Sequence, residues 1–139
     1  MITNSDILDL LSSAVQSGAG VRLAVSGRSM GPAFDSVSEI VVKPAIPAKL
    51  RVGEIVVVQR DGHWVVHRIM WHLGDRFITK GDGLSQLDRP RVIRTEIKGV
   101  VVGLGMKDGS TRNLCTFRVR VKGLISVMKG WASLWRTLR

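Results

Sequence analysis

The sequence contains no tyrosine, and phenylalanine and tryptophan together account for only 5% of its 139 residues. The core must therefore rest mainly on valine, isoleucine, leucine and methionine. This bias favours strands over a bundle of helices, because β-branched side chains pack well on a pleated sheet. The chain is long enough to bury a substantial core, so we expect one β-rich domain.

Cysteine is nearly absent as well. The single cysteine, Cys115, excludes an internal disulfide and is typical of a reducing compartment or of a buried thiol in a strand. It is a poor candidate nucleophile, since the residues around it predict the start of a strand. One cysteine and three histidines give no metal-site spacing, so no metal and no cofactor are expected.

Long apolar runs and acidic residues are also scarce. No run approaches the roughly 20 apolar residues that a membrane-spanning helix needs, and the N-terminus lacks the basic-then-apolar layout of a secretion signal. We therefore expect a cytoplasmic protein, with any membrane contact limited to the membrane surface. Eleven acidic residues stand against 21 basic ones, which gives a net charge of +10. Such a balance favours an anionic partner without naming it.

Hydrophobic periodicity predicts one helix followed by short strands. The helix spans Asn4 to Gln16, and Asp61-Gly62 is typical of a tight hairpin turn. The strands are predicted at residues 21–25, 40–43, 54–60, 64–71, 77–80, 95–104 and 111–121. Many short strands joined by turns indicate a mainly antiparallel β domain.

The last segment changes its period. We divide the chain into a domain over residues 1–122 and an amphipathic basic helix over 123–139, whose apolar residues recur at steps of three and four. This helix has two possible roles. It either lies on an anionic membrane surface with Trp131 and Trp135 at the interface, or packs the same stripe against the β domain.

Three kinds of residue suggest nucleophilic catalysis. A serine hydroxyl attacks a peptide only when a base takes its proton, and a third group usually orients a histidine base. Ser29 stands in a turn rich in glycine and proline, where backbone amides can form an oxyanion hole. His67 stands in a predicted strand, and Asp82 and Asp88 follow in a polar loop. By composition alone, each is equally well an ordinary structural residue.

The motifs around these residues resemble type I signal peptidases. Ser26–Phe34 resembles the nucleophile box with its Ser-Met-x-Pro pattern, and Arg51–Val58 resembles the strand that follows it. Val66–Ile69 is similar to the base box, and Phe77–Asp82, with Asp88 beyond it, is similar to the final box. Four boxes in the family's order make a specific match. The resemblance implies a signal peptidase/repressor-type antiparallel β domain that is barrel-like.

The base box indicates the branch of the superfamily. Bacterial-type signal peptidases and self-cleaving SOS repressors use lysine there, whereas archaeal and endoplasmic-reticulum signal peptidases use histidine, as at His67. The resemblance implies a Ser-His-Asp arrangement with Asp88 favoured as the orienting acid and Asp82 as its rival. It also implies an oxyanion hole at Ser29 and Gly27. Substrate binding is implied at Met30 and Pro32.

Two of the departures from the family pattern concern the oxyanion hole and the location of the protein. Gly27 provides no side-chain oxyanion donor, and no N-terminal membrane anchor is evident. We therefore expect a soluble relative of signal peptidases that cleaves a peptide or protein precursor, with small side chains before the cut and an extended substrate on a strand edge.

Two other classes of function remain as alternatives. One is a regulatory peptidase that cuts itself, for which Ala19-Gly20 resembles a cleavage site. The other is a basic nucleic-acid-binding β module. It is disfavoured because the strands lack paired stacking aromatics, so no specific nucleic-acid partner is expected.

Overall fold

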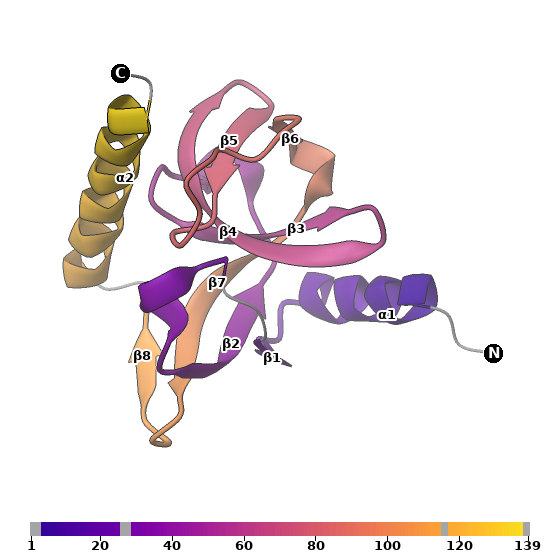
Figure 1. The fold of residues 1–139 in the computed structure, drawn as a ribbon. Helices are drawn as coiled ribbons and strands as arrows, with labels where there is room; N and C mark the ends of the chain where they lie inside the picture. The colour runs from indigo at the N-terminus through magenta and orange to yellow at the C-terminus, as the bar shows by residue number, and fades with distance from the viewer. Residues whose placement is uncertain (1–3, 26–28, 115–116, 138–139) are drawn as a thin grey trace.

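A mainly antiparallel β sheet lies between two helices in the computed structural model, which describes residues 4–25, 29–114 and 117–137. The helices α1 (Asn4–Gln16) and α2 (Phe117–Thr137) lie on opposite sides of the β domain (Figure 1). Eight strands form one sheet: β1 (Val21–Ala24), β2 (Val37–Lys43), β3 (Ile55–Arg60), β4 (His63–Leu73), β5 (Arg76–Lys80), β6 (Val92–Ile93), β7 (Ile97–Met106) and β8 (Thr111–Asn113).

The sheet is not closed into a barrel. Its strands follow the order β1-β2-β7-β3-β4-β5-β6, and β8 pairs with β7 outside this path. Among the described strands, β1 and β6 stand at the two ends of the order and do not pair with each other. The predicted antiparallel β domain is therefore confirmed, and the barrel-like closure is not observed.

The β3–β4 hairpin shows how local sequence sets the fold. Asp61 and Gly62 connect the two strands with φ angles of 51° and 75°. Positive φ at both positions matches the right-handed twist of a two-residue hairpin, and Gly adopts it without strain. The turn aligns Val56 with His67 and Arg60 with His63. The predicted hairpin is thus confirmed, and it places His67 at a defined register.

The hydrophobic core is divided between the two faces of β3. Ile55 and Val57 belong to one buried cluster, whereas Val56 and Val58 belong to the other. Successive side chains of a strand point to opposite faces, so a continuous apolar run marks a strand that is covered on both sides. This central strand therefore holds its neighbour β4, and His67 on it, in a rigid position.

The C-terminal region corrects one prediction. The strand expected over 111–121 ends at Asn113, and α2 begins at Phe117 rather than at Gly123. The sequence after Cys115 alternates apolar and basic residues, which favoured a strand, but these residues form the first turns of a long helix. Cys115 itself lies outside the described residues. The structure also contains β6, which the sequence pattern did not predict.

The helix α2 packs on the domain through small residues. A Cβ atom added to Gly123 would lie 2.9 Å from the backbone oxygen of Gly53, and one added to Gly130 would lie 2.7 Å from Cε of Met70. Val127, between these glycines, is buried. The helix therefore packs through one face, but several of its predicted stripe residues remain exposed, including Leu124, Met128 and Trp135.

Candidate active site

His67 is held by an aspartate from a distant part of the sequence. The imidazole is 5% exposed, and its Nδ1 lies 2.5 Å from Oδ2 of Asp88. When Asp88 is ionised its carboxylate only accepts hydrogen bonds, so Nδ1 carries the proton and donates it. This arrangement leaves Nε2 of the neutral ring as a proton acceptor, as a general base requires.

Thr79 holds Asp88 in place from the neighbouring strand. Its hydroxyl donates to Oδ2 of Asp88 at 2.6 Å, and its backbone oxygen accepts from the amide of Asp88 at 2.9 Å. Thr79 is buried in β5, next to β4 in the sheet. The orientation of the carboxylate is therefore set by strand pairing as well as by the loop. Thr79 was not among the predicted site residues, although it lies inside the box Phe77–Asp82.

The second nitrogen of the imidazole faces the interior. Nε2 of His67 is buried and has no hydrogen-bond partner among the described residues. A buried polar atom normally has a partner, so an exception calls for an explanation. Readiness to accept a proton from a reacting group is one such explanation, because catalytic hydrogen bonds often form only when substrate is bound.

Ser29 approaches the same point as His67. A Cβ atom added to Gly81 would lie 2.2 Å from the backbone oxygen of Ser29 and 3.0 Å from Nε2 of His67. The loop that follows also binds Ser29, since the amide of Gly83 donates to its carbonyl at 2.8 Å. Only glycine fits at position 81 without movement, because a Cβ atom there would clash with the backbone of Ser29. The backbone of Ser29 and Nε2 of His67 therefore both lie close to Gly81, and Nε2 has no hydrogen-bond partner among the described residues.

Asp82 binds a different partner. Its carboxylate accepts three hydrogen bonds from the guanidinium of Arg68, at 2.7 to 3.2 Å, and both side chains are largely buried. Arg68 also donates to the backbone oxygen of Gly53 at 2.8 Å. A bidentate pair of this kind fixes geometry as well as charge. The structure thus assigns Asp88 to His67 and Asp82 to Arg68, and it separates the two aspartates that the sequence left as rivals.

Lys80 connects the site with α2. It is 4% exposed, and its Nζ donates to the backbone oxygen of Gly81 at 3.2 Å. A Cβ atom on Gly130 of α2 would lie 3.8 Å from this nitrogen. The helix therefore covers the end of β5 that leads directly to Gly81. Lys80 lay within the final box, but its burial could not be inferred from the sequence.

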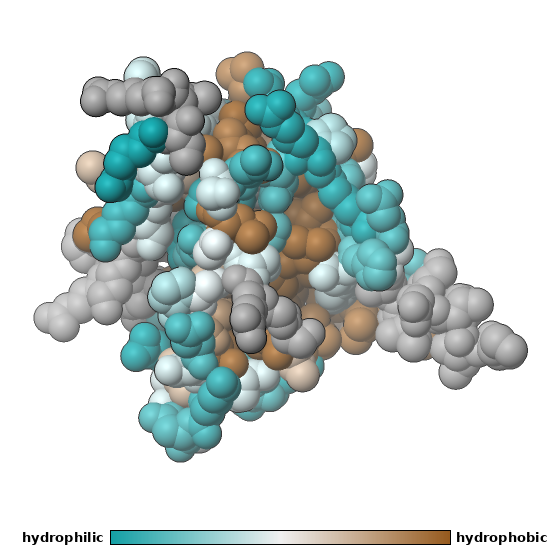
Figure 2. Space-filling view, viewed as in Figure 1, coloured by the Kyte–Doolittle hydropathy of each residue, from teal (hydrophilic) through white to brown (hydrophobic). Residues whose placement is uncertain are grey.

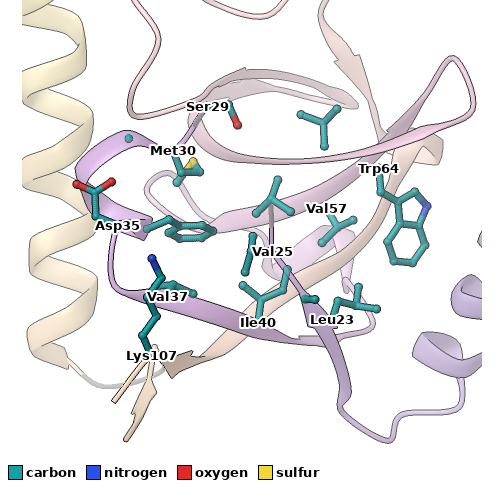
Figure 3. A pocket seen from close by; sticks show the side chains of 15 residues that line it. Leu23, Val25, Ser29, Met30, Asp35, Val37, Ile40, Val57, Trp64 and Lys107 are labelled. Atoms are coloured by element: carbon teal, nitrogen blue, oxygen red, sulfur yellow. The ribbon is translucent and has the colours of Figure 1, made fainter. Parts of the chain in front are cut away.

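A cavity of about 430 Å³ opens beside Ser29. Ser29 lies at its edge next to Met30 (Figure 3). Trp64 lies at one end of the cavity, and Asp35 and Lys107 lie at the end away from Trp64. Most of the residues that line it are apolar: Leu23, Val25, Met30, Phe34, Val37, Ile40, Val57, Trp64 and Val66. A cavity with an apolar lining and a few charged groups at its edge suits a peptide side chain.

Of the remaining predicted site residues, one lines the cavity, one does not, and one lies outside the described residues. Met30 is 3% exposed, so it lines the cavity as part of the core. Pro32 is exposed and is not among the residues that line the cavity. Gly27 lies outside the described residues. The oxyanion hole at Ser29 and Gly27 stays a prediction.

Two further findings concern ligands and membranes. Within the described ranges, no group of three or more His, Cys, Asp or Glu side chains is placed to hold a metal ion. Over the same part of the chain, neither helix has the length and apolar character needed to cross a membrane.

Comparison with protein-family models, with curated proteins and with solved structures finds no match to this chain.

Proposed function

We propose that the chain is a serine endopeptidase of the signal-peptidase-like class, with Ser29 as nucleophile, His67 as general base and Asp88 as orienting acid. One observation supports this proposal above all others. His67 is bound through Nδ1 to Asp88, and both its unpartnered Nε2 and the backbone of Ser29 lie next to Gly81. Three separate segments thus supply the proposed base, orienting group and nucleophile near one point, and this supports the proposal.

The proposed reaction proceeds by acyl transfer. The Ser29 hydroxyl attacks the scissile carbonyl while Nε2 of His67 takes its proton, and the carboxylate of Asp88 stabilises the imidazolium that forms. The imidazolium then protonates the leaving amine, so the peptide bond breaks and an ester on Ser29 remains. Water, deprotonated by the same nitrogen, hydrolyses this ester and regenerates the hydroxyl.

The proposed substrate is an extended segment of a peptide or protein precursor in the cytoplasm. The strand β1 stands at one end of the strand order, and its outer edge faces no other strand among the described residues. An extended peptide adds to such an edge through main-chain hydrogen bonds, while pockets select alternate side chains. The apolar cavity beside Ser29 is lined by Leu23 and Val25, at and just after β1, and supports this mode of binding.

The proposal is tested by comparing wild type with Ser29→Ala and His67→Ala on a complex peptide library derived from a proteome. New N-termini are identified by mass spectrometry. Wild type is expected to produce cleavage products that share a sequence pattern, and both variants are expected to lose them. Ser13→Ala, on an exposed position of α1, is the matched control and keeps full activity.

Two results would contradict the proposal. Cleavage that persists in Ser29→Ala, while circular dichroism shows an unchanged fold, excludes Ser29 as the nucleophile. A wild-type protein that produces no new termini and is not labelled at Ser29 by a fluorophosphonate excludes the activity itself. Incubation of the purified chain alone, followed by intact-mass measurement, separates cleavage of other chains from self-cleavage.

A further inference from the structure

The helix α2 is only partly covered by the domain. Gly123, Val127 and Gly130 form its docked face, because these positions are buried against Gly53, Met70 and their neighbours. Residues at spacings of three and four share one side of a helix. The docked face therefore accounts for one side of α2, and the stripe predicted from the sequence extends beyond it.

A line of large apolar side chains lies exposed beside the docked face. Leu124 is 49% exposed, Met128 70% and Trp135 69%. Their spacings of four and seven residues place them on one line, about 100° around the helix axis from the docked residues. Single exposed apolar residues are common, but a line of them on one helix marks an interaction surface.

Basic residues follow this line around the helix. Lys129 and Arg136, both exposed, are seven residues apart and lie about 100° beyond the apolar line. The sequence from Phe117 to Arg139 contains no acidic residue. Figure 2 shows hydrophobic and hydrophilic atoms side by side on the outer surface of α2, at the left of the view. We call Leu124, Met128, Trp135, Lys129 and Arg136 the outer face of α2.

We infer that the outer face of α2 binds the surface of an anionic lipid bilayer, with the helix axis parallel to the membrane. Leu124, Met128 and Trp135 would enter the boundary between headgroups and acyl chains. Lys129 and Arg136, a quarter turn away, would remain at the level of the lipid phosphates. An exposed apolar line beside a basic line, on a helix that does not span, is the pattern of an interfacial helix.

Two other occupants fit the outer face less well. Nucleic acid would neutralise the basic line but would leave Leu124 and Met128 in water, since neither stacks on bases. A second copy would bring together two chains that each carry a charge of +10, with the same basic residues close to the contact. An anionic bilayer satisfies the apolar and the basic side chains together.

The test is co-sedimentation of the full chain with vesicles of phosphatidylcholine alone and of phosphatidylcholine mixed with phosphatidylglycerol. Wild type is expected to pellet with the mixed vesicles, at least tenfold more strongly than with phosphatidylcholine, and less at high salt. Met128→Ser/Trp135→Ser is expected to weaken binding to the mixed vesicles at least tenfold. Lys129→Gln/Arg136→Gln is expected to abolish the preference for phosphatidylglycerol.

Matched controls come from other exposed positions. Ile46→Ser removes an exposed apolar side chain away from α2, and Lys43→Gln/Arg76→Gln removes two charges from the sheet. Both are expected to bind as wild type does, and circular dichroism checks that every variant is folded. Ser29→Ala is also expected to bind the mixed vesicles as wild type does. The outcome of this test is therefore independent of the proposed peptidase activity.

Three outcomes would overturn the inference. One is wild type that does not pellet, or pellets equally with both kinds of vesicle. Another is a Met128→Ser/Trp135→Ser variant that binds as tightly as Ile46→Ser. The third is a dimer of wild type, seen by size-exclusion chromatography with light scattering and lost in Met128→Ser/Trp135→Ser, which would assign the outer face to a second copy.

Discussion

Replacing Gly81 by alanine adds one methyl group at the point where Ser29 and His67 approach each other. The new Cβ would lie 2.2 Å from the carbonyl oxygen of Ser29 and 3.0 Å from its carbonyl carbon. Both are backbone atoms, so no side-chain rotation relieves the contact. A tolerable separation requires the backbone of Ser29 to move away from position 81 by roughly 1 Å, and a displacement of this size at a catalytic residue can lower the rate about 100-fold.

The same substitution also affects stability. Overpacking of a well-packed site typically costs about 1–3 kcal/mol of unfolding free energy. For a chain of this length we expect the Tm to fall by roughly 3–10 °C. The loss of rate is expected at temperatures where the variant remains folded, because the methyl group separates nucleophile from base without unfolding the sheet.

The measurement combines thermal unfolding with the rate of fluorophosphonate labelling at Ser29 and the rate of peptide cleavage. Gly103→Ala is the matched control, since its new Cβ would meet its nearest neighbours at 3.4 and 3.5 Å, an ordinary contact distance. We expect wild-type rates for Gly103→Ala and rates about 100-fold lower for Gly81→Ala. Equal rates in the two variants would refute the close approach of Ser29 and His67 at Gly81.

Three other predictions follow from the side-chain partners. Asp88→Asn removes the charge that stabilises the protonated imidazole, and should lower kcat by about 10⁴-fold with an unchanged circular dichroism spectrum. Arg68→Gln leaves the largely buried Asp82 carboxylate unpaired, and should destabilise the fold by about 3–5 kcal/mol in urea; Arg68→Met/Asp82→Leu should be less destabilised than Arg68→Gln. Burial raises the pKa of Glu96, but hydrogen bonds and the charge of Arg60 outweigh burial and lower it. The stabilisation that Glu96 provides at neutral pH, measured against Glu96→Gln, should therefore disappear as the pH falls through this lowered pKa; a constant difference would refute it.

Much of the fold followed from local patterns. The bounds of α1 and β1 and the Asp61-Gly62 turn were each predicted within a residue or two, because backbone geometry at these places depends on neighbouring residues. The predicted start of α2 was wrong because it, too, depended on a pattern of neighbouring residues. Alternating residues after Cys115 favour a strand locally, and no local signal showed that they continue into the helix.

The candidate site was predictable only in part. The motifs predicted Ser29 and His67 as site residues, and in the structure the backbone of Ser29 and Nε2 of His67 both lie next to Gly81. Asp82 and Asp88 occupy the same polar loop, and the resemblance favoured Asp88 but left Asp82 as its rival. That assignment depends on the path of the loop and on Thr79, which holds Asp88 from the adjacent strand.

The sequence by itself determined the β-rich character, the two terminal helices and the candidate nucleophile and base, because periodicity, turn residues and motifs are properties of neighbouring positions. Only the tertiary structure decided that the sheet stays open, that Asp88 rather than Asp82 binds His67, and which side of α2 is covered. Each of these depends on contacts between segments far apart in the chain, and such contacts form only when strands and helices pack against one another.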